Sequence, residues 1–141
     1  ILSYYLGQRH TICTFDRQCS QYIVIEHAGD AYCCDFFVES KWHLGNIFET
    51  PIDMLATSAK KRQFARVKTK LCNRCLVCRH LDICRGGCMK DRAPFDKENY
   101  GRESYFCEAY KRFFEYSAPK FMDLAGRIKM GEFNRPDENP S

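Results

Sequence analysis

The sequence predicts a small α+β domain whose segments are stapled together by metal-bound cysteines. Three observations support this prediction: two β-branched and aromatic runs near the N-terminus, apolar residues at helical spacing further on, and ten cysteines, five of them between residues 72 and 88. At 141 residues the chain has room for one modest core. We therefore expect a hairpin, cysteine-rich cluster-binding loops and about three helices in a single domain over residues 1–131.

The composition limits the possible classes of function. Hydrophobic residues make up 45% of the chain and charged residues 28%, as in globular proteins. No apolar run approaches the roughly 18 residues that a membrane span requires. The net charge of +4 is spread along the chain, with one dense basic group at Lys60, Lys61 and Arg62. We expect neither a membrane nor a nucleic acid among the partners.

The first half of the chain predicts a hairpin and then a helix. Residues 22–27 (YIVIEH) and 31–38 (AYCCDFFV) flank an Ala-Gly-Asp turn, which indicates a β-hairpin. A helix is indicated from Thr50, with Thr50 as its cap and Pro51 at its first position. The expected apolar stripe of this helix comprises Ile52, Leu55, Ala56 and Ala59. Its expected solvated face carries Lys60, Lys61 and Arg66.

The second half predicts two further helices after a polar loop at residues 90–102. The apolar positions of the first are Phe106, Ala109, Tyr110 and Phe113. Those of the second are Phe121, Leu124, Ala125 and Ile128, with Gly131 as a stop signal. Residues 132–141 are polar and contain proline, so we expect a disordered tail there.

The ten cysteines admit three explanations. They stand at positions 13, 19, 33, 34, 72, 75, 78, 84, 88 and 107. Disulfides are disfavoured, because neighbours two residues apart would close only short loops. Zinc ribbons normally present two separate C-x2-C pairs, whereas here one pair is followed by wider x5 and x3 steps. Iron-sulfur clusters take four thiolates each, and eight of these cysteines supply two complete sets.

Five segments of the sequence together resemble a known family. They are CTFDRQC (13–19), YCCDFF (32–37), LGNI (44–47), CLVCRHLDICRGGCMKDR (75–92) and YFCEAYKRFF (105–114). In order and spacing they resemble the C-terminal SPASM region of the anaerobic sulfatase-maturating enzymes. That family belongs to the radical S-adenosylmethionine proteins and carries two auxiliary 4Fe-4S clusters.

The resemblance implies a ligand set for each cluster. It assigns the first cluster to Cys13, Cys19, Cys34 and Cys88. It assigns the second to Cys75, Cys78, Cys84 and Cys107. Each cluster would then tie together remote segments, so we expect the chain not to fold without metal. Of the two remaining cysteines, Cys33 alternates with Cys34 and is expected to be a small buried hydrophobe, while Cys72 is an alternative ligand to Cys75.

The resemblance also implies a reaction, the oxidation of a sulfatase cysteine or serine to Cα-formylglycine. A deoxyadenosyl radical removes a hydrogen atom from the substrate Cβ, a base takes a proton, and one electron leaves. Asp35 follows Cys34 at the position of the family's catalytic aspartate, and an anionic cluster nearby would raise its pKa toward the useful range. The neighbouring Phe36 and Phe37 are expected in the core, and His10 and His80 are expected to face water.

The chain lacks the C-x3-C-x2-C motif that binds the S-adenosylmethionine cluster. We therefore expect a cytoplasmic enzyme whose missing N-terminal radical domain binds S-adenosylmethionine, with unfolded sulfatase polypeptide as the other partner and no activity of this chain alone. Two rival functions stay open. One is a radical enzyme that modifies another peptide, and the other is a zinc-binding module for protein interaction. Zinc is expected to fill the same thiolate sites in protein produced in air.

Overall fold

A computed structural model describes residues 1–92 and 101–133 and shows an α+β fold, as expected. The strands are β1 (Val24–Ile25), β2 (Asp30–Tyr32) and β3 (His43–Asn46). The α-helices are α1 (Leu2–Tyr5), α2 (Ile52–Ala56), α3 (Ala59–Val67), α4 (Asn73–Leu76), α5 (Leu81–Cys84) and α6 (Cys107–Lys129). Four short 3-10 turns cover Cys13–Phe15, Asp35–Phe37, Ser40–Trp42 and Met89–Asp91.

The predicted hairpin is present and is extended by a third strand. Strands β1 and β2 pair antiparallel, with Val24 opposite Tyr32, and β3 pairs antiparallel with the other edge of β2. Gly29 makes the turn possible, because its φ of +87° belongs to the left-handed region that favours glycine. The second strand is shorter than the sequence predicts, since after Tyr32 the chain turns to form the 3-10 turn Asp35–Phe37.

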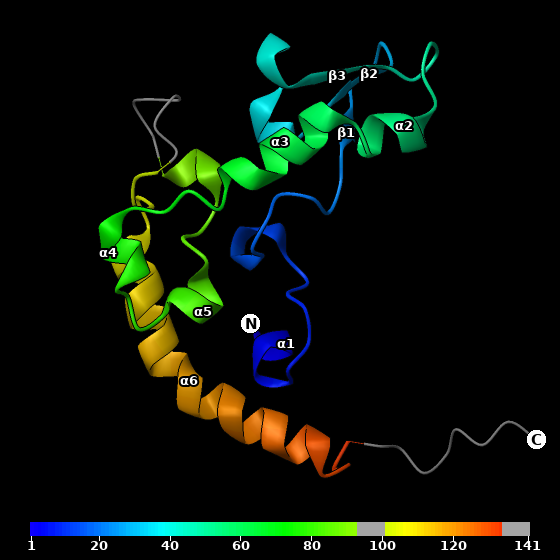
Figure 1. Ribbon diagram of the computed structural model, residues 1–141. Coiled ribbons are helices and arrows are strands. Elements are labelled where there is room, and N and C mark those ends of the chain that lie inside the picture. The colour runs from blue at the N-terminus through cyan, green and yellow to red at the C-terminus, as the bar shows by residue number, and fades with distance from the viewer. Residues whose placement is uncertain (93–100, 134–141) are drawn as a thin grey trace, which may run out of the picture.

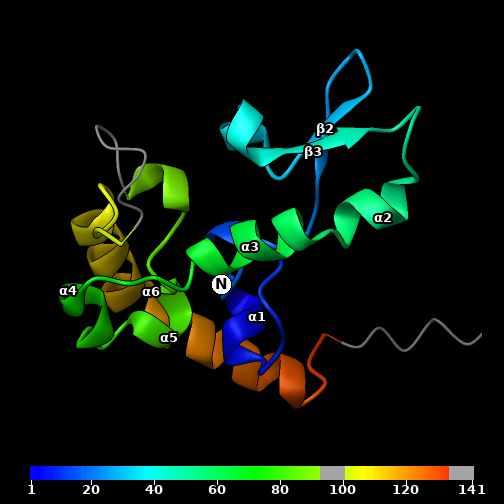
Figure 2. The ribbon, with the colours of Figure 1, turned by 45° about the horizontal axis from the view of Figure 1, so that its top comes forward.

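The elements form two groups, which Figure 1 and Figure 2 show from two directions. In one group α2 and α3 lie beside the small sheet, and in the other α4 and α5 lie beside the first half of α6. Helix α1 packs against α6, where Tyr5 stacks on Phe121 with ring centroids 6.0 Å apart. The cysteine-rich segments connect the two groups.

Each group has its own small core. The core under the sheet contains Cys33, Cys34, Phe37, Trp42, Phe64 and Met89. The core beside α6 contains Phe15, Ile83 and Phe114, with Tyr5 and Tyr110 packed against it. A fully buried aromatic side chain stabilises the fold by roughly 1.5–3 kcal/mol, so cores of this size are modest.

The helix predicted from Thr50 is two helices with a different buried face. Pro51 is the cap rather than the first helical residue of α2, and α3 starts anew at Ser58, whose side chain accepts a hydrogen bond from the Lys61 backbone N–H at 3.2 Å. Within the expected stripe only Leu55 is buried. Lys61, expected on the solvated face, is also buried, because α3 turns it toward the cysteines.

The two predicted C-terminal helices are one continuous helix, α6, which runs through Pro119. An interior proline costs about 3 kcal/mol, and the apolar contacts on both sides of Pro119 offset that cost. The expected stripe is also wrong in its first half, since Phe113 is 45% exposed while Phe114 is 1% exposed. The helix ends before Gly131, which has a φ of +81°, as predicted. The predicted tail at 132–141 and the predicted polar loop at 90–102 lie largely outside the described residues.

Candidate metal centres

One pocket collects four of the predicted ligands. Cys75, Cys78, Cys84 and Cys107 all line it, together with His80, Tyr110 and Phe114. Cys75 lies in α4, Cys84 ends α5, and Cys107 opens α6 almost twenty residues beyond the central run. The pocket therefore joins three helices that are separate in sequence, and it matches the set that the resemblance assigns to the second cluster.

A left-handed turn joins this pocket to the next ligand along the chain. Arg85, Gly86 and Gly87 have φ values of +50°, +76° and +69°. Three successive left-handed residues reverse the chain within the x3 step between Cys84 and Cys88, which is what the two glycines allow. Backbone N–H groups of Gly86 and Gly87 also point at the Cys84 thiol, whose pKa burial raises and these hydrogen bonds lower, with a net rise.

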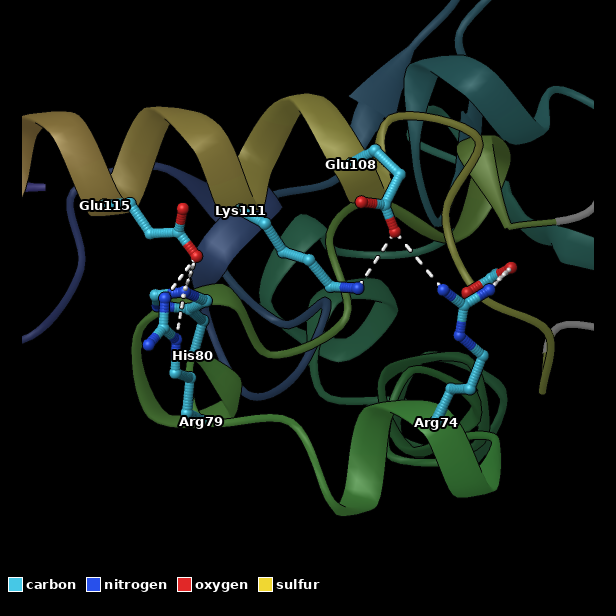
Figure 3. A network of polar contacts seen from close by, with 7 residues as sticks. Arg74, Arg79, His80, Glu108, Lys111 and Glu115 are labelled. Atoms are coloured by element: carbon cyan, nitrogen blue, oxygen red, sulfur yellow. Dashed lines mark hydrogen bonds and ion pairs between the residues drawn. The ribbon is translucent and has the colours of Figure 1, made fainter.

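Ion pairs hold α6 against the segment that carries the central cysteines (Figure 3). Glu108 of α6 accepts hydrogen bonds from Arg74 at 3.2 Å and from Lys111 at 2.9 Å. About two turns further on, Glu115 pairs with Arg79 and lies 3.5 Å from His80. These pairs are largely exposed and individually weak. Those of Arg74 and Arg79 join α6 to the segment of the central cysteines, on the side where Cys107 meets the other three cysteines of its pocket.

A second pocket collects three of the four ligands assigned to the first cluster. Cys13, Cys19 and Cys34 line it together with Tyr22, Cys33 and Lys61. Cys88 is not among the lining residues, although the charges of Cys13 and Lys68 both influence its thiol. The C-x5-C loop is shaped by buried Asp16, which accepts hydrogen bonds from Arg9 and Gln21 at 2.9 Å and 2.8 Å.

The two cysteines outside the assigned sets differ from each other. Cys33 is fully buried in the core under the sheet, as expected for a small hydrophobe, but it also borders the pocket of the first set. Cys72 caps α4, and its sulfur lies 3.6 Å from that of Cys75. It does not line the pocket of the second set, which favours Cys75 as the member of that set.

Burial raises the pKa of most cysteines in the two assigned sets. Burial raises the pKa of Cys19 to about 11 and that of Cys34 to about 12. Burial, together with a hydrogen bond from Cys72, raises the pKa of Cys75 to about 12. Metal coordination requires thiolates, so uptake of metal at these positions must release protons. Within residues 1–92 and 101–133, no three His, Cys, Asp or Glu side chains converge closely enough to hold one metal ion; the sulfurs line pocket walls instead.

Three buried cations face the cysteines, and the sequence analysis missed all of them. Lys61, Lys68 and Arg92 are 4%, 1% and 1% exposed. Lys61 Nζ donates to the carbonyl oxygens of Tyr22 at 2.6 Å and Cys33 at 2.8 Å. Lys68 Nζ donates to those of Cys13 and, at 2.9 Å, Thr14. In the described part of the chain no carboxylate lies within ion-pair distance of any of the three cations.

Burial lowers the pKa of each lysine, and negative charge on nearby cysteines raises it. For Lys61 these cysteines are Cys33, Cys19, Cys34 and Cys13. For Lys68 the cysteines are Cys19, Cys88 and Cys13. A signal for both was present in the sequence, because Lys61, Phe64, Ala65 and Lys68 follow the i, i+3, i+4, i+7 spacing of one helix face.

Asp35 has an exposed side chain and lies beside the pocket of the first cysteine set, next to the lining residues Tyr22 and Cys34. Its Oδ1 accepts hydrogen bonds from Tyr22 Oη at 3.0 Å and Cys34 Sγ at 3.3 Å. Burial raises the pKa of Asp35, but these two hydrogen bonds and those from the backbone N–H groups of Asp35 and Phe36 together lower it more, so the net direction is downward. The rise expected beside an anionic cluster stays a prediction. Phe36, expected in the core, is instead 52% exposed beneath the Lys90 ammonium, whereas Phe37 is buried as expected.

His80 corrects another expectation, because it lines the second-set pocket instead of facing water. Its ring lies 5.7 Å from that of Phe114 and its Nε2 lies near Glu115. No helix among the described residues is long and apolar enough to cross a membrane.

Comparison with known proteins agrees with this geometry. The SPASM family model, described as an iron-sulfur cluster-binding domain, matches residues 13–79. A cysteine-type anaerobic sulfatase-maturating enzyme of Clostridium perfringens is 36% identical over 118 residues, which cover 83% of this chain and 31% of that protein. A serine-type enzyme of Bacteroides thetaiotaomicron is 30% identical over 132 residues, covering 93% and 32%.

Solved structures give the same result. The structure described as native anSMEcpe with bound AdoMet and Cp18Cys peptide superposes with a TM-score of 0.78 at 31% identity, covering 89% of this chain and 34% of that one. The chain thus spans about a third of the length of the relatives that it matches. Residues 13–79 therefore match the SPASM family model of an iron-sulfur cluster-binding domain, and the chain is similar to the anaerobic sulfatase-maturating enzymes, as the sequence resemblance indicated.

Proposed function

We propose that this chain holds two auxiliary 4Fe-4S clusters within a radical S-adenosylmethionine enzyme that oxidises a sulfatase cysteine or serine to Cα-formylglycine. The observation that carries the proposal is that Cys75, Cys78, Cys84 and Cys107 all line one pocket. Four thiols on one pocket match the ligand demand of one such cluster. Cys13, Cys19, Cys34 and Cys88 form the second proposed set.

The buried cations support the donor chemistry. Burying an uncompensated charge is costly, so buried cations are normally paired with negative charge. Lys61 and Lys68 have carbonyl oxygens as partners and cysteine sulfurs nearby. A cluster with four thiolate ligands is usually anionic, and such a group in these pockets would supply the missing countercharge. Its chemistry there would be to accept and pass on an electron, since four cysteines leave no iron open.

Asp35 is the proposed general base. Its carboxylate is exposed at the pocket edge, so a substrate can reach it, and the hydrogen bond from Tyr22 fixes its orientation. The hydrogen bonds of the chain lower the pKa of Asp35, and the proposal requires the negative charge of a cluster beside Cys34 to raise it toward the range of a useful base. The correspondence of Asp35 to the family's catalytic aspartate rests on the sequence resemblance, and the second experiment below tests its role directly.

Partner and substrate follow from the family. The proposed partners are a radical domain that binds S-adenosylmethionine, joined to this chain in one cytoplasmic protein, and an unfolded sulfatase polypeptide. Both a cysteine-type and a serine-type relative match this chain, so either substrate residue fits. The peptide in the related structure belongs to that protein, and it supports a peptide substrate here.

The first experiment measures iron, sulfide and zinc in protein that is purified without air and reconstituted with iron and sulfide. We expect about eight iron and eight sulfide per chain, with broad absorbance near 400 nm. Tight binding of about two zinc with no iron uptake would favour the zinc module instead. The isolated chain should form no aldehyde on a sulfatase peptide, since the radical motif is absent from it.

The second experiment tests Asp35 in a protein that joins this chain to a radical domain. Asp35→Asn should keep the iron content and the cleavage of S-adenosylmethionine but lose formylglycine formation by about 100-fold or more, because the proton acceptor is gone. Asp53→Asn is the matched control, since Asp53 lies on α2 away from both pockets. Full activity of the Asp35→Asn protein would remove the residue from the mechanism.

A further inference from the structure

Arg92 is as deeply buried as Lys68 and makes more hydrogen bonds than either buried lysine. Its guanidinium donates five hydrogen bonds, all to backbone carbonyl oxygens. The acceptors are Gly86 at 2.9 Å, Lys68 at 2.7 Å, Lys70 at 3.0 Å, Arg85 at 2.7 Å and Gly87 at 3.4 Å. Every N–H direction of the planar fork is therefore used to hold main chain in place.

Arg92 holds two segments, and one of them lies between a cysteine of each set. Three of its bonds go to the Arg85–Gly87 turn, which lies between Cys84 of the second set and Cys88 of the first. Its other two bonds go to the segment after α3, at Lys68 and Lys70. The same guanidinium thus positions one proposed ligand of each cluster.

The charge of Arg92 also faces both sets. Burial lowers the pKa of Arg92, and negative charge on four cysteines raises it: Cys75, Cys19, Cys84 and Cys88. Two of these sulfurs belong to each set. Within the described residues no carboxylate lies within ion-pair distance of the guanidinium. Arg92 lines neither cysteine pocket, so its charge reaches the sulfurs of the two sets through space and not by direct contact.

We propose that Arg92 is a positioning residue shared by both cluster sites, which clamps the turn between their ligands and supplies one fixed positive charge to both clusters. The proposal rests on the proposed function, because it presupposes two clusters. Reduction adds one negative charge to a cluster, and a nearby fixed cation stabilises that charge. Arg92 therefore raises both midpoint potentials and eases the passage of an electron from one site to the other.

The test measures both midpoint potentials by anaerobic redox titration with electron paramagnetic resonance, on the reconstituted chain. Arg92→Lys keeps the charge and should keep both potentials close to wild type. Arg92→citrulline keeps the shape and most N–H donors but loses the charge, and it can be introduced by joining two pieces at the Gly87–Cys88 bond. We expect both potentials to become more negative in the citrulline protein. Arg66→Gln, an exposed arginine of α3, is the matched control and should shift neither potential.

The outcomes separate this inference from the proposed function. Wild-type protein that takes up no iron would refute the proposed function, and the inference with it. Wild-type protein with two clusters whose potentials do not change in the citrulline protein would refute the inference alone. A shift in only one cluster would also refute it, because the charge would then serve one site. Iron content gives a second readout where the citrulline protein takes up less iron than wild type. If it lacks both clusters and Arg92→Lys takes up both, the shared role is supported. If the citrulline protein lacks only one cluster, or if Arg92→Lys also lacks clusters, the shared role is refuted.

Discussion

Gly86→Ala should lower the free energy of unfolding, because the added Cβ would collide with Arg92 and Leu71. Gly86 has a φ of +76°, and an added Cβ would lie 2.6 Å from Arg92 Nη2 and 2.7 Å from Leu71 Cδ2. Neither neighbour has room to stay where it is, because both distances are shorter than real Cβ contacts. The substitution therefore adds backbone strain and also displaces the guanidinium that holds the turn.

The magnitude follows from these two effects. A non-glycine residue in the left-handed region costs about 1–2 kcal/mol. Loss of one hydrogen bond from the charged Arg92 to Arg85 or Gly87 costs about 1.5–3 kcal/mol more. The expected loss in free energy of unfolding is therefore about 2.5–5 kcal/mol.

Gly7→Ala is a matched control within the same chain. Gly7 has a nearly identical φ of +75°, and an added Cβ there would meet nothing within 4 Å. It should therefore show the strain alone, about 1–2 kcal/mol. The assay is urea unfolding followed by far-UV circular dichroism, without air and with both proteins at the same iron and sulfide content. Equal losses in the two variants would refute the reasoning, because the displaced Arg92 would then contribute nothing.

Three further predictions address the loop, the buried lysine and the spare cysteine. Asp16→Asn should lower the free energy of unfolding at pH 7 by about 1–3 kcal/mol. Burial raises the pKa of Asp16, but its hydrogen bonds lower it below the unfolded value of about 3.9, so this stability is present above that pH and is lost as pH falls through the folded pKa. Urea midpoints should show a gap between wild type and variant that is constant from pH 7 to about 5 and closes below about 4; a gap that widens in acid would contradict this. Lys61→Met should cost about 2–4 kcal/mol in the same unfolding assay because it leaves two buried carbonyls unpaired, whereas Lys60→Met on the exposed face should cost less than about 1 kcal/mol. Cys72→Ser should retain about eight iron per chain and Cys75→Ser about four, and the reverse pattern in iron analysis would make Cys72 the ligand.

Much of the fold and the site was predictable because it depends on local spacing. The hairpin follows from two apolar runs around Gly29, and the tight turn before Cys88 follows from two consecutive glycines. The grouping of eight cysteines came from motif resemblance, and seven of them line the two pockets in the sets that it implied. The ligand roles themselves stay predictions.

The errors arose where tertiary contacts outweigh local preference. Proline normally ends a helix, but α6 continues through Pro119 because Phe114 packs in a core before it and Phe121 stacks on Tyr5 of α1 after it. Lysine is normally exposed, but Lys61 is buried because the carbonyl oxygens of Tyr22 and Cys33, beside the pocket of the first cysteine set, accept its hydrogen bonds. Neither contact can be inferred from neighbouring residues, since each joins segments that are distant in sequence.

The sequence by itself determined which residue types are available for cluster chemistry and how the ligands within each short motif are spaced, because these depend only on covalent order. Only the tertiary structure decided that Cys107 reaches the central cysteines and that Lys61, Lys68 and Arg92 are buried around them. The physical reason is that charge compensation acts through space. A cation can be buried only where carbonyl oxygens and anionic groups from several remote segments meet, and the fold alone brings those segments together.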